Sequence, residues 1–122
     1  MRESLLSAKS FEYALRVIKL SSFLRKEKGE YMLGKQILRS GTSVGANIRE
    51  GYYAQSDADF ISKMSIARNE AAETEYWLEL SWASDYITKI QFESLFADCE
   101  ELMKLLTSTI KTMKSKNGKL TQ

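Results

Sequence analysis

The chain contains no proline in 122 residues. Proline ends or kinks helices and is frequent in turns, so its absence favours long uninterrupted helices over a β or α/β domain. Hydrophobic residues make up 43% of the chain, and a domain of this length can bury a core without metals or disulfides. We therefore expect a single all-α domain.

Apolar residues recur at steps of three and four along four stretches, which is the spacing of one helix face. These stretches predict helices at residues 4–26, 30–54, 57–84 and 89–114. Because the connections between them are short, each helix must run antiparallel to the next. The predicted fold is an antiparallel up-down-up-down four-helix bundle.

Residues typical of helix ends stand at the predicted boundaries. Gly29 is placed to end the first helix. Two pairs have the spacing of a capping box, Ser56 with Asp59 and Thr88 with Gln91. Residues 115–122 lack periodicity, so they are predicted to form a frayed tail.

Four glycines, Gly34, Gly41, Gly45 and Gly51, fall inside the predicted second helix, and the first three are our candidates for close packing. Each should cost roughly 1 kcal/mol relative to alanine in a helix interior. Close approach of a neighbouring backbone, which only a missing side chain permits, would offset this cost, so we assign Gly34, Gly41 and Gly45 to close helix packing. The small residues Ala71 and Ala72 of the third helix are the expected neighbours.

The predicted first helix has two apolar seams instead of one. The seams are Ala8, Phe11, Leu15, Ile18 and Ser22, and Tyr13, Val17, Leu20 and Leu24. Together they make a face wider than one partner helix needs. This helix could therefore lie deep in the bundle or share a face with another subunit.

Charge is unevenly distributed although the net charge is only +2. Residues 1–50 carry a net +5, residues 51–101 carry −8 and residues 102–122 carry +5. The basic part could bind nucleic acid, subunits could meet head to tail, or adjacent helices could neutralise each other. The candidate nucleic-acid contacts are Lys9, Arg16, Lys19, Arg25, Lys26, Lys28, Lys35, Arg39 and Arg49.

Catalytic chemistry finds little support in the composition. The chain has no histidine, which removes the commonest general base and most metal sites. Glu70 and Glu73 have helical spacing, but without imidazole or a second glutamate-rich helix we interpret them as a solvated face. The single cysteine, Cys99, is expected to be a buried core thiol. We expect no catalytic residue, no metal, no cofactor and no enzymatic activity.

Two polar residues, Asn47 and Glu50, lie on or beside the glycine-containing seam. They could form a polar contact surface. Alternatively, Asn47 hydrogen-bonds across helices and Glu50 pairs with Arg39 or Arg49, an arrangement that can fix helix register. The N-terminal segment lacks an apolar run long enough for a signal peptide or a membrane span, so we expect no membrane association and a cytoplasmic location.

The second and third predicted helices resemble the 23S rRNA intervening-sequence protein family. The matching residues are Gln36, Arg39, Ser40, Ser43, Asn47, Ile48, Glu50, Gly51, Phe60, Ala67, Glu70, Glu73 and Leu78. The resemblance implies an up-down bundle that assembles into a ring, often a pentamer. It also implies kinship with the accessory protein of diversity-generating retroelements, a positively charged pentameric bundle that works with a reverse transcriptase and binds nucleic acid.

These observations lead to two functional hypotheses. The first is a non-enzymatic homo-oligomeric bundle that binds structured nucleic acid, RNA in preference to DNA, through basic surfaces of the first two helices. The alternative is an assembly scaffold that binds protein partners and has no nucleic-acid ligand.

Overall fold

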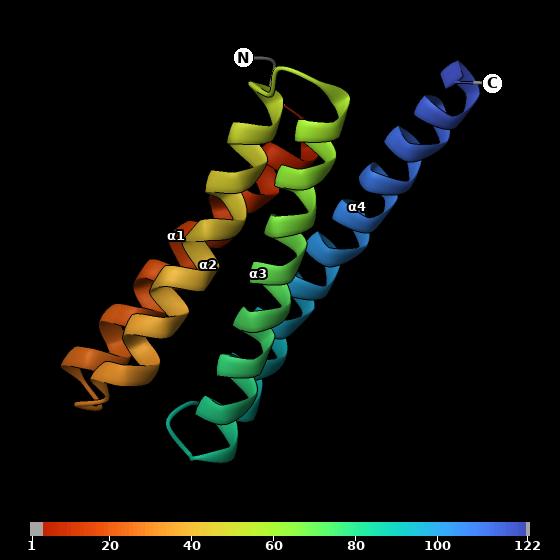
Figure 1. Ribbon diagram of the computed structural model, residues 1–122. Helices are drawn as coiled ribbons and strands as arrows, with labels where there is room; N and C mark the ends of the chain where they lie inside the picture. The colour runs from red at the N-terminus through yellow and green to blue at the C-terminus, as the bar shows by residue number, and fades with distance from the viewer. Residues whose placement is uncertain (1–3, 122) are drawn as a thin grey trace.

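The computed structural model describes residues 4–121, which form four α-helices (Figure 1). The helices are α1 (Leu5–Lys26), α2 (Tyr31–Tyr52), α3 (Asp57–Ala83) and α4 (Lys89–Thr121). Each helix packs against the next in the chain, and α1 also contacts α4, though less extensively. The predicted all-α four-helix bundle is therefore confirmed, with the connections between consecutive helices short enough to make neighbours antiparallel (Figure 1).

Capping residues set where the helices begin. The hydroxyl of Ser56 accepts a hydrogen bond from the Asp59 amide at 3.1 Å. Before α4, the Thr88 amide donates to the Gln91 side chain at 2.8 Å, and the Gln91 amide donates back to the Thr88 hydroxyl at 3.1 Å. Each of these bonds satisfies an amide that the helix itself leaves unpaired. The predicted capping box of Thr88 and Gln91 is therefore confirmed, whereas Ser56 caps α3 through its hydroxyl group alone.

Two residues with positive φ reverse the chain after α1 and α3. Gly29, at a φ of 64°, follows α1 as predicted. Asp85, at a φ of 65°, follows α3, and the Tyr86 amide donates to the Ser81 carbonyl at 2.9 Å. This is the hydrogen bond of a Schellman motif, and aspartate is one of the few residues with a side chain that tolerates the left-handed region.

The fourth helix is longer than the sequence pattern predicts. It continues through Lys114 as far as Thr121, so the expected frayed tail is helical except at Gln122, which lies outside the described residues. No proline interrupts this segment, and its one glycine, Gly118, costs only about 1 kcal/mol in a helix. The apolar periodicity therefore ends where α4 no longer buries one side in the core, although the helix continues to Thr121.

Inward-facing residues of all four helices form one hydrophobic core. A buried hydrogen bond at 2.9 Å, from the hydroxyl of Thr74 in α3 to that of Ser40 in α2, lies within it. The buried apolar residues are Leu6, Tyr13, Val17, Leu20, Leu24, Leu33, Ile37, Val44, Ile48, Met64, Ala67, Ala71, Leu78, Ile87, Leu95, Cys99, Leu102, Leu106 and Ile110.

Gly34, Gly41 and Gly45 of α2 face α1, and the expectation that they face Ala71 and Ala72 of α3 is wrong. The remaining glycine of this helix, Gly51, does face α3, where a Cβ atom would lie 2.8 Å from Cε of Met64. A Cβ atom at Gly41 would lie 2.6 Å from Cγ1 of Val17, far inside contact distance. At Gly34 the nearest atom of the α1 backbone would be the Ser21 carbonyl oxygen at 3.2 Å.

Close packing is strictest at Gly41 and relaxed at Gly45. A Cβ atom at Gly45 would lie 3.4 Å from the hydroxyl of Ser10, which is an ordinary contact. Gly34 and Gly41 therefore do allow close helix packing, and the helix that approaches them is α1. The sequence pattern identified the seam of α2 correctly but could not show which neighbour occupies it.

Candidate functional site

The outer surface of α1 carries an unpartnered apolar face. Phe11, Leu15 and Ile18 share one side of the helix and are 56%, 49% and 46% exposed. We call these three residues the α1 apolar face. The second seam of the same helix, which includes Val17 and Leu24, is buried in the core. The helix therefore does not lie deep in the bundle on both seams: one seam is buried in the core and the other is on the surface.

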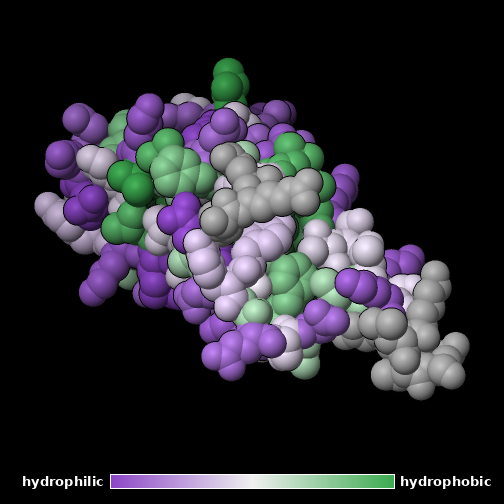
Figure 2. Space-filling view, turned by 90° about the horizontal axis from the view of Figure 1, so that it is seen from above, coloured by the Kyte–Doolittle hydropathy of each residue, from purple (hydrophilic) through white to green (hydrophobic). Residues whose placement is uncertain are grey.

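A groove lies beside the α1 apolar face, between α1 and α2, with a volume of about 390 Å³. Small residues, among them Gly45 and Ala46, keep it open, and Phe11 forms part of one wall. Arg49 and Glu50 also line it, which gives an apolar groove a polar margin. Hydrophobic side chains also reach the surface between hydrophilic ones at the end of the molecule where α2 meets α3 (Figure 2).

Three of the predicted nucleic-acid contacts are instead bound to acidic side chains within the bundle. Lys9 and Arg16 of α1 pair with Glu101 and Asp98 of α4. These pairs tie together the two helices that pack least extensively. The interpretation that adjacent helices neutralise each other therefore holds at this boundary.

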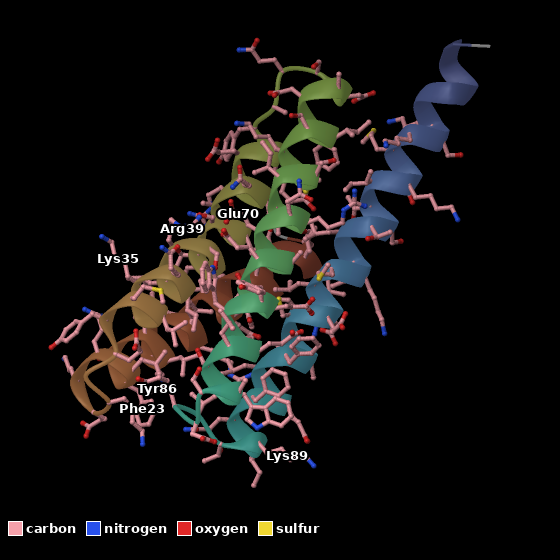
Figure 3. The ribbon with its side chains drawn as sticks, turned by 60° about the horizontal axis from the view of Figure 1, so that its bottom comes forward. Phe23, Lys35, Arg39, Glu70, Tyr86 and Lys89 are labelled. Atoms are coloured by element: carbon pink, nitrogen blue, oxygen red, sulfur yellow. The ribbon has the colours of Figure 1, made fainter. Side chains whose placement is uncertain are left out.

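The third of these cations, Arg39 of α2, lies beside Glu70 of α3 (Figure 3) and binds its carboxylate at 3.4 Å. Arg39 also binds the carboxylate of Glu73. The hydrogen bond to Glu73 is the largest cause that raises the pKa of Arg39. Glu70 and Glu73, expected to be a solvated face, therefore hold α2 and α3 together. All three residues match the pattern on which the family resemblance rests, so this part of the pattern has a structural role.

Asn47 and Glu50 also differ from their expected contacts. The side-chain amide of Asn47 donates to the Ser43 carbonyl of its own helix at 2.8 Å, so it makes no bond across helices. Glu50 accepts a hydrogen bond from Lys63 of α3 at 3.0 Å, and neither Arg39 nor Arg49 is its partner. The expected partners of both residues are therefore wrong, although Glu50 does form a hydrogen bond between α2 and α3.

The remaining predicted cations, Lys19, Arg25, Lys26, Lys28, Lys35 and Arg49, form no ion pair among residues 4–121. Four of them, Arg25, Lys26, Lys28 and Lys35, surround the connection between α1 and α2, and Lys35 projects outward there (Figure 3). We call these four the hairpin basic patch. Tyr31, the first residue of α2, is 68% exposed.

Glu75 and Glu79 have the same helical spacing that led us to interpret Glu70 and Glu73 as a solvated face, but Glu75 lies partly buried between α3 and α4. Glu75 of α3 is half-buried, and its Oε2 atom has no hydrogen-bond partner among the described residues. Burial, and then the charges of Glu100 in α4 and of Glu79, raise the pKa of Glu75 to about 7. The spacing of α3 residues alone could not reveal this, because Glu100 comes from a different helix.

Glu75 should make the stability of the bundle depend on pH. Its folded-state pKa of about 7 lies above the ordinary value of 4.5, so the folded state binds the proton more tightly than the unfolded chain. Stability should therefore be greatest below about pH 4.5, as far as this group is concerned, and fall as pH rises through 7. We expect Glu75→Gln to raise the free energy of unfolding at pH 8 by about 1 kcal/mol, because partial exposure reduces the full effect of such a shift. Urea unfolding of both proteins at pH 5 and 8 measures this, with Glu27→Gln, at an exposed position after α1, as control. If Glu75→Gln changed the free energy of unfolding equally at pH 5 and pH 8, the prediction would be contradicted.

No catalytic or metal-binding arrangement is found in the part of the chain that the structure describes. No three His, Cys, Asp or Glu residues between 4 and 121 gather to hold a metal ion. Cys99 is buried and donates to the Ala71 carbonyl at 3.2 Å, and burial raises its pKa to about 12, so it is not a reactive thiolate. Among the described helices, none combines the length and apolar character that crossing a membrane requires.

Comparison with known proteins agrees with this architecture. The sequence model of the family described as 23S rRNA-intervening sequence protein matches residues 2–108. A crystal structure of a protein with unknown function from the S23 ribosomal protein family of Bacteroides thetaiotaomicron VPI-5482 is 55% identical to the chain. The two superpose with a TM-score of 0.87, over 88% of this chain and 96% of the other. No curated protein matches the chain.

Proposed function

Since this chain belongs to the 23S rRNA intervening-sequence protein family, we propose that it is a non-enzymatic bundle that assembles with copies of itself through the α1 apolar face. The observation that carries this proposal is the exposure of Phe11, Leu15 and Ile18 on one side of α1. Single exposed apolar residues are common, but three that share a helix face beside an apolar groove form a continuous patch, which is typical of protein interfaces.

The groove between α1 and α2 favours a specific contact over nonspecific association. Its small lining residues Gly45 and Ala46 leave room for a partner's side chain, while Arg49 and Glu50 provide charges of both signs at its margin. An apolar centre with a polar rim is the usual anatomy of a stable interface. The assembled form that the family resemblance implies is a closed ring of five copies.

If assembly stabilises the bundle, its melting temperature must depend on protein concentration, because mass action favours the assembled state. We expect the melting temperature to rise by roughly 3–5 °C for each tenfold increase in concentration across the micromolar range. Circular dichroism melts at several concentrations measure this. A melting temperature that stays constant over two decades of concentration would contradict the proposal.

A second candidate function, binding of structured nucleic acid with RNA preferred to DNA, is supported by the hairpin basic patch. Its cations have no acidic partner among residues 4–121, and Tyr31 beside them is exposed. Lysine and arginine bind phosphates, and an exposed aromatic ring can stack on an unpaired base. In a ring, each copy would contribute one patch, so contacts that are weak singly would add up.

Charge reversal tests the hairpin basic patch. We expect Arg25→Glu with Lys35→Glu to weaken binding of a structured RNA by at least about tenfold at low salt, because it removes two phosphate contacts and adds two repulsive charges. Fluorescence anisotropy at two salt concentrations gives the affinity. The control is Arg68→Glu with Lys89→Glu, which reverses two cations outside the first two helices and changes the net charge by the same amount. Equal weakening by the control would show that only net charge matters.

A further inference from the structure

The C-terminal part of α4 is a basic helix that extends beyond the region matched by the family. The family match ends at residue 108, whereas α4 remains helical to Thr121 (Figure 1). From residue 102 to the end, the chain has five lysines and no acidic residue. This segment therefore differs in charge from the first half of the same helix, which contains Asp98, Glu100 and Glu101.

The lysines of this segment up to residue 116 are exposed. Lys104 and Lys111 lie away from the buried seam, and Lys114 and Lys116 lie beyond its last buried residue in the described part of the chain, Ile110. This seam, with Leu102, Leu106 and Ile110, is buried in the core. The exposed residues from 102 to 116 are only lysines and residues with hydroxyl groups, namely Lys104, Thr107, Ser108, Lys111, Thr112, Lys114, Ser115 and Lys116. We call these four lysines the α4 lysine face.

The charges of the α4 lysine face are not neutralised within the described part of the bundle. None of its four lysines forms an ion pair there. In contrast, Lys9 of α1 is paired with Glu101, one of the last acidic residues of α4. Helix α4 thus binds the cations of α1 with its acidic first half and presents its own cations to solvent with its second half. Figure 1 shows that this second half diverges from the other helices.

We propose that the α4 lysine face binds the phosphate backbone of nucleic acid, independently of base sequence. This inference rests on the second candidate function and assigns to it a surface outside the first two helices. Ammonium and hydroxyl groups donate hydrogen bonds to phosphate oxygens. Residues 102–116 include no carboxylate that would repel a phosphate group. The lysines extend over about 18 Å of helix axis, a length over which one strand of a duplex displays about five phosphates.

A membrane surface fits this face less well. Helices that lie on membranes insert an exposed apolar side below the headgroups. Here the apolar side of α4, with Leu102, Leu106 and Ile110, is occupied by the core of the bundle. Charge alone would then have to hold the protein on the lipid, whereas a nucleic acid needs no apolar insertion.

The test is fluorescence anisotropy of the full chain with a labelled DNA duplex at several salt concentrations. The variant replaces Lys104, Lys111, Lys114 and Lys116 with glutamine, which keeps the helix propensity high. We expect affinity at low salt to fall by about tenfold or more, and the slope of log affinity against log salt to decrease by roughly 0.9 for each phosphate that the variant no longer binds. Replacement of the same four lysines with arginine should retain the affinity, and circular dichroism should show equal helix content in all proteins.

The hairpin variant Arg25→Glu with Lys35→Glu separates this inference from the function on which it rests. Weakening by the α4 variant supports the α4 lysine face, whatever the hairpin variant does. Wild-type binding that the α4 variant leaves unchanged would overturn this inference while the candidate function stands. Absence of wild-type binding at low salt would overturn both, and so would binding of vesicles with anionic lipid in place of nucleic acid.

Discussion

Replacement of Gly41 with leucine is expected to lower the free energy of unfolding by about 3 kcal/mol or more. A Cβ atom alone would lie 2.6 Å and 2.7 Å from the two methyl carbons of Val17, so a larger side chain must push α1 away from α2. Overpacking of a tight core typically costs 1–3 kcal/mol, and separation of two helices also exposes their shared surface. Urea unfolding at one fixed protein concentration measures the effect.

Two further variants isolate the contact from a general effect of altering the helix. Gly45→Ala should cost nothing and could gain up to about 1 kcal/mol from helix propensity, because a Cβ atom fits beside Ser10. Val17→Ala should remove part of the penalty when combined with Gly41→Ala, and a double-mutant cycle would show coupling of about 1 kcal/mol or more. Unchanged stability of Gly41→Leu would mean that the two helices do not pack closely at this point.

Lysine substitutions in the α1 apolar face are expected to abolish self-assembly. Phe11→Lys combined with Leu15→Lys places two charges at the centre of the proposed interface, where each would be buried without a partner. The two side chains are about half exposed in the single bundle, so its fold should persist. We expect the variant to sediment as a monomer with unchanged helix content, while the native protein sediments as a larger species.

A control on the same helix makes that result specific. Glu12→Lys introduces the same side chain at an exposed position next to Phe11 but off the apolar face. We expect it to leave the assembly intact. If both variants became monomers, the loss would reflect the added positive charge and would not locate the interface.

The course of the helices was predictable because it depends on local signals. The steps of apolar residues and the caps at Ser56 and Thr88 act within a few neighbouring residues, so the beginnings of α3 and α4 agree with the sequence. The end of α4 was not predictable from periodicity, because a helix can continue with an exposed side on which no apolar spacing is required.

Contacts between helices were predicted less well because they depend on which faces meet. Gly41 was correctly assigned to close packing, yet its partner is Val17 of α1 and not the small residues of α3. Arg39 was assigned to nucleic acid, yet it binds Glu70 and Glu73, which lie 31 and 34 residues away in the chain. The sequence around a charged residue does not show whether that residue binds a side chain of another helix or a ligand.

The exposure of the α1 apolar face also could not be predicted from the sequence. The sequence showed two apolar seams on this helix and left open whether the helix lies deep in the bundle or shares a face with another subunit. The structure places Val17 inside and Phe11 outside, which turns an ambiguous pattern into a located surface. That location is what makes the assembly proposal testable with single residues.

Self-assembly is the proposal on which the proposed function depends, and the mass of the native protein in solution decides it. Size-exclusion chromatography with multi-angle light scattering at micromolar concentration gives that mass without reference to shape. We predict a mass that is a multiple of the 14.0 kDa of one chain, five chains in the form that the family resemblance implies. A mass of 14.0 kDa throughout the peak would contradict self-assembly, because the α1 apolar face would then face solvent.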